Sequence, residues 1–258
     1  MPTTIKQIAE KLEEFAPLRL QESYDNCGLQ IGDENTVVRN ILVTIDITEE
    51  VLEEAKQKNC ELIICHHPMI FRGLKHVTNS NMIERCVKYA IKNDIAIYAS
   101  HTCLDKAKNG VSFKLAKLLG LNNLQPLERE EEGLGCIGYL AEPEDELSFL
   151  KRVKELVQTG CIRHTTLLGK KIEKVALCGG AGVEFLDKAI EAQADIYLTG
   201  DIKYHDFFLP EKRIILADIG HFESEQFTKE LIYDVLYEKN SNFAIHYSEI
   251  TTNPIKYL

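Results

Sequence analysis

Apolar residues recur along this chain with two different periods, and the period changes from one segment to the next. Near the N-terminus, Ile5, Ile8 and Leu12 are spaced three or four residues apart, which places them on one face of a helix. Thr4 begins a capping-box pattern directly before this face. The pattern therefore predicts a helix from about residue 5 to residue 16.

The first half of the chain then alternates short apolar runs with amphipathic segments. This order of strand, helix and strand is typical of parallel sheets whose crossover connections are helices. Strands are predicted at 41–45, 62–65 and 95–99, and helices at 48–59, 82–93 and 112–119, the last closed by Gly120.

The second half repeats this alternation. Helices are predicted at 146–158 and 184–192, and strands at 175–178, 196–199 and 214–217. The polar stretch 122–135 contains a run of charged residues, which favours a solvated linker. The sequence thus predicts an α/β protein of two similar lobes, 1–127 and 128–258, with a short linker, no inserted domain, and the functional cleft between the lobes.

The two predicted lobes correspond at a constant offset. Residues 41–67 and 175–201 share the order strand, turn, helix, strand and polar loop, 134 positions apart. In each lobe a further apolar run leads to the pattern His-x-x-x-acid, namely His101 with Asp105 and His221 with Glu225. An internal duplication explains why both lobes end in the same residue types.

The composition of the chain disfavours several classes of function. The 258 residues are 45% hydrophobic and carry a formal net charge of −10, with no run rich in lysine and arginine, so nucleic acid is not an expected partner. No stretch of 18 apolar residues occurs, which argues against a membrane protein and for a cytoplasmic one. None of the eight cysteines forms a C-x-x-C pair, so we interpret them as reduced packing residues.

Ligand-type side chains follow four of the predicted strands. In an open α/β sheet, ligands bind at the loops beyond the carboxyl ends of the strands. We therefore expect these side chains to serve one purpose, and metal binding is a purpose that all of them can share. They are His66 with His67, His101 with Asp105, Asp201 with His205, and His221 with Glu225.

The adjacent pair His66 and His67 favours two metal ions rather than one, because successive side chains of an extended backbone point to opposite sides. For the pair alone, exposed or hydrogen-bonded loop histidines are the alternative, and Pro68 after a buried strand favours a rigid metal loop. A set of imidazoles and carboxylates without thiolates suits Zn²⁺, Fe²⁺ or Mn²⁺.

Other motifs leave alternatives open. The glycine-rich stretch 179–182 is consistent with an anion site at a helix start or with a tight turn that needs positive φ. Asp25 and Asn26 form either a substrate loop or an Asx-type turn. Lys203 and Tyr204 are placed to meet an anionic substrate beside Asp201 and His205.

With these residues in view, the chain resembles the Nif-three-like family, also known as the GTP cyclohydrolase I type 2 family. The resemblance covers nearly the whole chain, and its motifs together are specific although His-His-Pro alone is not. The matching segments are 22–32, 65–71, 100–105, 199–206, 218–225 and 252–258.

The resemblance implies two divalent metal ions and assigns their ligands. His67 and Asp105 are expected to hold one ion, His66 and His221 the other, and Glu225 to bridge them. His101 is not a ligand in the family pattern, so we assign it a catalytic role in proton transfer or in orienting a ligand. Relatives assemble as ring-shaped homohexamers, and longer relatives carry an inserted domain that is missing from this chain.

The leading functional hypothesis is a metal-dependent hydrolase, because two ions clamp a substrate oxygen and lower the pKa of a bound water. The family name suggests GTP as the small-molecule substrate, with loss of formate and dihydroneopterin triphosphate as the product. A metal-dependent phosphoesterase is a competitor within the same class. A non-catalytic regulatory or scaffold protein, in which the ions only organise the cleft, is the alternative from a different class.

Overall fold

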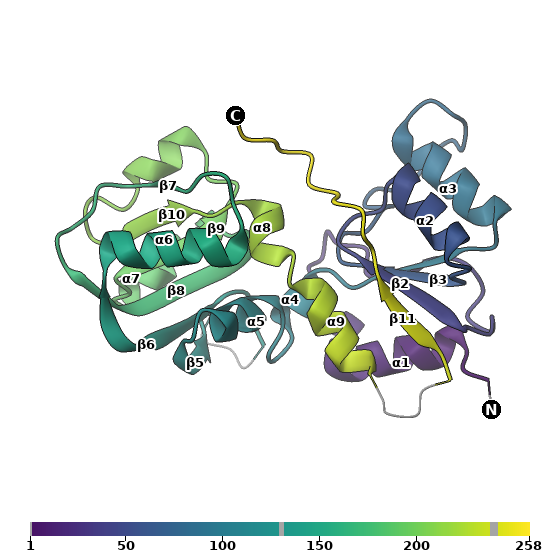
Figure 1. Cartoon of the computed structure of the whole chain (residues 1–258), viewed down its shortest axis with the longest axis horizontal. Helices are drawn as coiled ribbons and strands as arrows, with labels where there is room; N and C mark the ends of the chain where they lie inside the picture. Colours follow the sequence, from purple (N-terminus) through teal and green to yellow (C-terminus); the bar gives the residue numbers. More distant parts are fainter. Residues whose placement is uncertain (1, 129–131, 238–241) are drawn as a thin grey trace. The chain divides into compact units, whose positions relative to one another are not determined.

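The computed structural model describes residues 2–128, 132–237 and 242–258, and it shows an α/β protein (Figure 1). The chain forms two compact units. Unit 1 contains Met1–Leu104 and Thr228–Pro254, and unit 2 contains Asp105–Phe227 and Ile255–Leu258. The α/β class is as predicted, but the units divide the chain differently from the predicted lobes 1–127 and 128–258, because a late segment of the chain returns to unit 1.

Unit 1 is built around a five-stranded sheet in the order β1-β4-β3-β2-β11. Strands β2, β3, β4 and β11 run parallel, and β1 pairs antiparallel with β4. Because the strands are parallel, the carboxyl ends of β2, β3 and β4 lie at one edge of the sheet. The strands are β1 (Gly28–Ile31), β2 (Asn40–Thr44), β3 (Leu62–Cys65), β4 (Ala96–Ala99) and β11 (Ala244–Tyr247).

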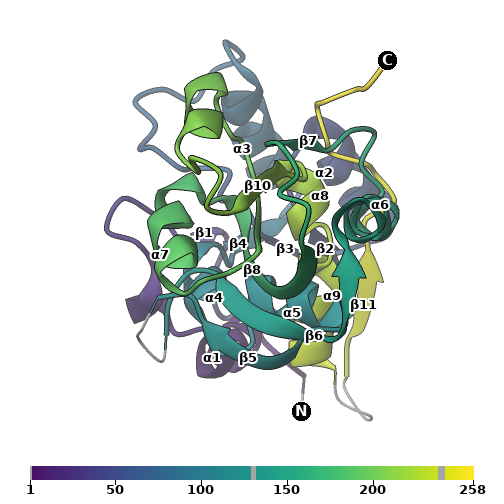
Figure 2. The ribbon, with the colours of Figure 1, turned by 90° about the vertical axis from the view of Figure 1, so that its left-hand side faces the viewer.

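Helices cover both faces of this sheet: α2 and α3 lie on one face, and α1 and α9 on the other (Figures 1 and 2). Helix α1 begins as predicted, since Thr4 and Gln7 form a capping box and Ile5, Ile8 and Leu12 are buried. The helices of unit 1 are α1 (Ile5–Phe15), η1 (Leu18–Leu20), α2 (Glu49–Gln57), α3 (Met82–Lys92) and α9 (Thr228–Leu236), and α4 (Thr102–Lys106) crosses the boundary to unit 2.

Unit 2 contains a six-stranded sheet in the order β5-β6-β8-β9-β10-β7. Its three central neighbours β8, β9 and β10 run parallel, and the remaining pairs are antiparallel. The strands are β5 (Asn122–Pro126), β6 (Cys136–Asp145), β7 (Arg163–His164), β8 (Lys171–Ala181), β9 (Ile196–Gly200) and β10 (Ile215–Asp218).

Alternate residues of β8 pack into separate cores on the two faces of this sheet. Val175 and Leu177 join the core under α5 and α6, whereas Ala176 and Cys178 join the core under α7. Figure 2 shows α6 and α7 on opposite sides of the sheet. The helices are α5 (Val111–Leu118), α6 (Glu146–Val157), η2 (Val183–Phe185), α7 (Leu186–Glu191), η3 (Tyr204–Phe208) and α8 (His221–Glu225).

The prediction of a linker at 122–135 is wrong for the first part of this stretch, because Asn122–Pro126 forms strand β5 and pairs with β6. Glu128, the first residue of the charged run, forms an ion pair with Lys188, and the residues 129–131 of that run lie outside the described residues. Polar composition alone did not distinguish an edge strand from a linker, since one face of an edge strand is open to solvent. The internal duplication stays a prediction, although each unit contains three consecutive parallel strands.

No helix in the described ranges is long and apolar enough to cross a membrane. All eight cysteines are free thiols, six of them buried, as expected for packing residues. Cys161 is the exposed exception.

Candidate metal centre

His66 lies at the carboxyl end of β3 in unit 1, beside the end of the neighbouring strand β4. It follows β3 directly and has no exposed surface. Its Nδ1 lies 2.9 Å from the carbonyl oxygen of Ser100, the residue after β4. Because a carbonyl oxygen only accepts, Nδ1 carries the proton and Nε2 carries the lone pair.

His67 is oriented by a carboxylate that follows the neighbouring strand β2. Its Nδ1 lies 2.7 Å from Oδ1 of Asp46, and the Thr252 hydroxyl donates to Oδ2 of the same carboxylate at 2.6 Å. Burial alone would raise the pKa of Asp46, but the hydrogen bond and charge of His67 outweigh it and lower the pKa below its ordinary value. Asp46 thus fixes the ring and leaves Nε2 as the coordinating atom.

His101 follows β4 and is held by Asp25, whose side chain has no exposed surface. Oδ1 of Asp25 lies 2.9 Å from Nδ1 of His101, and Oδ2 accepts the backbone N–H and the hydroxyl of Thr102. Burial would raise the pKa of Asp25, but these hydrogen bonds hold it well below its usual range. Oδ1 of Asp25 also accepts the backbone N–H of Asn26 at 2.7 Å, so this carboxylate bonds both its own loop and the residues after β4.

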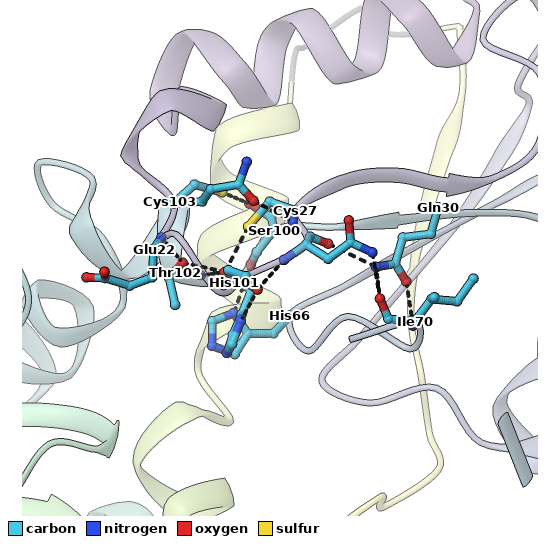
Figure 3. Close-up of polar contacts among 12 residues, drawn as sticks. Glu22, Cys27, Gln30, His66, Ile70, Ser100, His101, Thr102 and Cys103 are labelled. Carbon is cyan, nitrogen blue, oxygen red and sulfur yellow. Dashed lines mark hydrogen bonds and ion pairs between the residues drawn. The ribbon is translucent and has the colours of Figure 1, made fainter. Parts of the chain in front are cut away.

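Three of the histidines of unit 1, His66, His67 and His101, form one cluster. Each offers a ring nitrogen, and these three atoms all lie within 4.8 Å of one another. The ring centroids of His66 and His101 are 5.3 Å apart, and Figure 3 shows these two residues side by side. Strand β1 is tied to the chain after β3 by Gln30, whose side-chain oxygen accepts from the backbone N–H of Ile70 at 3.0 Å.

His221 begins helix α8 in unit 2 and stands between two carboxylates. Its Nδ1 lies 2.8 Å from Oδ2 of Asp201, which follows β9, and its Nε2 lies 3.2 Å from Oε2 of Glu225. Burial would lower the pKa of His221, but the hydrogen bonds and charges of Asp201 and Glu225 raise it to about 11. This pair of carboxylates therefore holds a positive charge between them.

Two glycines make room for His221 and Glu225. A Cβ on Gly180 would lie 2.2 Å from Oε1 of Glu225, and a Cβ on Gly200 would lie 2.7 Å from the backbone nitrogen of His221. The backbone N–H groups of Gly179 and Gly180 donate to hydroxyl oxygens of Ser112 and Ser224. Of the two alternatives for 179–182, the structure favours the turn over the anion site, because Gly180 has a positive φ of 64° and the N–H groups of Gly179 and Gly180 are used within the protein.

Asp105 lies in the first turn of α4 and belongs to unit 2. Burial raises the pKa of the Cys178 thiol, and the negative charges of Asp105 and Glu225 raise it further. The two acids that the His-x-x-x-acid pattern singled out therefore act on one common neighbour within unit 2. Glu225 is only 4% exposed, so its charge is costly without a cation nearby.

Not every predicted residue joins these groups. His205 packs beside the rings of Tyr204 and Phe208 in η3. Lys203 starts this short helix, where its backbone N–H donates to Asp206. The role of Asp46 was missed, although its position after a strand was the signal that found the other acids.

The sequence profile of the Duf34/NIF3 (NGG1p interacting factor 3) family matches residues 3–254. The chain belongs to this family. A Lactococcus lactis subsp. lactis relative named GTP cyclohydrolase 1 type 2 homolog is 37% identical over 250 residues, covering 94% of this chain and 95% of the relative. A Clostridium perfringens relative of the same name is 34% identical over 228 residues, covering 86% of each.

The fold of this Duf34/NIF3 member is shared by a solved structure. A Bacillus cereus protein related to NIF3 superposes with a TM-score of 0.93 at 27% identity, covering 100% of this chain and 99% of that one. The family resemblance drawn from the motifs is confirmed, and the histidine and glutamate groups of the structure are able to hold a metal ion.

Proposed function

We propose that this protein is a hydrolase that depends on two divalent metal ions held by His66, His67, Asp105, His221 and Glu225. One observation carries the proposal: Nδ1 of every histidine in this set is bound to an acceptor, namely Ser100, Asp46 or Asp201. Histidine ligands of metals almost always donate their other ring N–H in this way, which fixes the ring and raises the basicity of Nε2.

The donor set fits the proposed ions. Three imidazoles and two carboxylates without a thiolate suit Zn²⁺, Fe²⁺ or Mn²⁺. The proposed ligands are divided between the two units, so the proposal requires each unit to contribute ligands to the two ions. Glu225 is the proposed bridge, and its burial supports a role in offsetting the charge of two cations.

The remaining residues orient groups and move protons. When bound, the ions would supply a water of lowered pKa and would stabilise charge on a substrate oxygen. His101 offers a ring nitrogen within 4.8 Å of ring nitrogens of His66 and His67 and is the proposed group that exchanges a proton with the substrate. Asp25 holds the His101 ring in the orientation that this transfer needs.

The name of the relatives points to GTP as the first substrate to test, with release of formate from the purine ring. Phosphoester hydrolysis is the competing reaction, because two-metal sites commonly serve phosphatases.

The test begins with metal analysis of the purified protein, where we expect close to two divalent ions per chain. Formate release from GTP is then compared with phosphate release from a panel of phosphoesters. Metal content near zero after supplementation would contradict the metal centre. Full metal content without turnover of either class would favour the scaffold alternative. Light scattering of the same sample tests the homohexamer that the resemblance implies.

A further inference from the structure

Two cysteines of unit 1 are in contact although they are 76 positions apart in the sequence. Cys27 lies in the loop before β1, and Cys103 lies in the first turn of α4. The two thiols are hydrogen-bonded to each other, and Figure 3 shows them beside Ser100. Both are free thiols in this structure, so a disulfide between them would be a second state of the molecule.

The two thiols differ in their access to solvent. Cys103 is only 1% exposed, and its Sγ lies 3.8 Å from the hydroxyl of Ser100. Cys27 is partly exposed and belongs to the loop 21–27. A dissolved oxidant therefore meets Cys27 first, with Cys103 already beside it as the second thiol. A disulfide requires the sulfur atoms to approach to about 2.05 Å, and Cys27 can make this movement because it belongs to a loop.

Cys27 shares a partner with the histidine cluster. Its S–H donates to Oδ2 of Asp25 at 3.2 Å, and Oδ1 of the same carboxylate holds Nδ1 of His101. Oδ2 also accepts the backbone N–H of Thr102. A disulfide would remove the S–H, and with it one of the hydrogen bonds that hold the Asp25 carboxylate. It would also tie the loop 21–27 covalently to the residues that follow β4.

We propose that Cys27 and Cys103 are a redox-sensitive pair that closes to a disulfide on reaction with a small-molecule disulfide such as oxidised glutathione. The Cys27 thiolate attacks one sulfur of the oxidant, which forms a mixed disulfide and releases one glutathione thiolate. The Cys103 thiolate then attacks Sγ of Cys27 and releases the second glutathione. Across both steps the protein gives up two protons and two electrons, and the oxidant leaves as two molecules of glutathione.

The closure should be slow. The hydrogen bond with Cys103, burial and the charge of Asp25 all raise the pKa of the Cys27 thiol above its ordinary value. Thiol–disulfide exchange starts from the thiolate, so little of the reactive form is present at neutral pH. The pair should therefore stay reduced through a brief exposure and close under sustained oxidation. The proposal is independent of the metal centre, because neither thiol belongs to the proposed ligand set.

The test uses the full-length protein carrying Cys161→Ser, because Cys161 is the exposed thiol and would react with the oxidant by itself. Of the eight cysteines, this variant keeps seven. After prolonged incubation with oxidised glutathione, the thiols counted with a maleimide under denaturing conditions should fall to five. The intact mass should fall by that of two hydrogen atoms. A protease digest made without reductant should contain one pair of peptides, joined through Cys27 and Cys103.

Serine variants in the same background provide the controls. Cys27→Ser should keep all six of its thiols, because Cys103 has lost the sulfur that it would attack. Cys60→Ser removes another buried thiol of unit 1 and should still lose two. Seven thiols after oxidation, a lasting mixed disulfide of Cys27 with glutathione, or a disulfide between other cysteines would overturn the proposal. The digest of the Cys161→Ser protein decides this even where a further variant fails to fold.

Hydrogen exchange of the oxidised protein tests the effect on the loop 21–27. The backbone N–H groups of Asp25 and Cys27 donate to Glu22 and Gln21 within this loop. They should exchange about tenfold more slowly after oxidation, because the disulfide limits local opening. The amides of α2 should exchange as before. Unchanged exchange in the loop of fully oxidised protein would overturn the link between the disulfide and the Asp25 loop.

Discussion

The two units contribute different chemistry to the proposed metal centre. Unit 1 supplies the imidazoles of His66, His67 and His101, each held at Nδ1 by an acceptor that is a carbonyl or a carboxylate. Unit 2 supplies His221 between two carboxylates, those of Asp201 and Glu225. In unit 1 the carboxylates Asp46 and Asp25 only orient imidazole rings, whereas in unit 2 the carboxylate of Glu225 is itself a proposed metal ligand.

This contrast indicates how each unit would be stable without a bound metal ion. A neutral imidazole can be buried at little cost once one ring nitrogen has an acceptor. Buried carboxylates need a nearby cation, and in unit 2 the raised pKa of His221, about 11, supplies it as a bound proton. A metal ion would replace that proton, so unit 2 should respond to charge substitutions more strongly than unit 1.

The largest effect is expected at the proposed bridge. Glu225→Gln keeps the shape of the side chain but removes the negative charge between two cations, so both ions should bind more weakly and one should fall below detection. Asp105→Asn should affect chiefly the ion shared with His67. Metal content by mass spectrometry and anomalous diffraction would check this, and equal losses in the two variants would mean that the bridge is assigned to the wrong acid.

A second effect should appear in turnover without loss of metal. His101→Ala should retain most of the bound metal, yet lower hydrolysis by about 10²–10⁴-fold because proton transfer is lost. His76→Ala, at an exposed position, serves as the control and should change neither quantity. Complete loss of one ion in His101→Ala would make His101 a ligand and would extend the imidazole set of unit 1.

A smaller effect is expected from the carboxylates that orient histidines. Asp46→Asn and Asp201→Asn should each weaken metal binding by about 10–100-fold, because the amide orients the ring less well and carries no charge. The loss should be greater at Asp201, which contributes charge to the site of unit 2. Asp195→Asn is a control carboxylate that accepts backbone N–H groups of β8. A greater loss at Asp46 would reverse our comparison of the units.

The smallest effect concerns the stability of unit 1 alone. Burial would raise the pKa of Glu54, but hydrogen bonds from the Glu249 backbone, Lys58 and Ser248 lower it below its ordinary value. A carboxyl group whose pKa is lower in the folded state stabilises that state above the unfolded pKa, and the contribution is lost as pH falls through the folded pKa.

Glu54→Gln should therefore lower the free energy of unfolding by roughly 1 kcal/mol at pH 7. The difference from the parent should shrink towards pH 3. Thermal unfolding of metal-stripped protein from pH 3 to 7 would check this. A difference that does not depend on pH would show that Glu54 acts through packing rather than charge.

Much of the fold was predictable from the sequence. The helix after Thr4 and the strand Leu62–Cys65 were predicted closely, because a cap and a fully apolar run are local signals. Strand β5 was missed, since its exposed side chains resemble a linker. The unit boundaries were missed for a different reason: β11 completes unit 1 by pairing with β2 from about 200 positions away.

The candidate ligands were also accessible from the sequence, because strand ends and residue types both pointed to them. Their partners were not. That Asp46 meets His67 and Asp25 meets His101 depends on which strands are neighbours, and the spacing along the chain does not contain that information. Gly180 likewise leaves space for Glu225 because β8 and α8 are in contact, and this contact cannot be seen from the spacing of the two residues along the chain.

The path of the chain has a consequence for the order of folding during synthesis. Unit 2 takes nearly all its residues from one continuous stretch, Asp105–Phe227. Strand β2 of unit 1, although made early, finds its neighbour β11 only when residues Ala244–Tyr247 have left the ribosome, and α9 also comes late. Since domains generally fold as units as they emerge, unit 2 should reach its native state before unit 1. The three-histidine cluster, encoded near the start, should then be among the last parts of the nascent protein to gain a completed sheet beneath it.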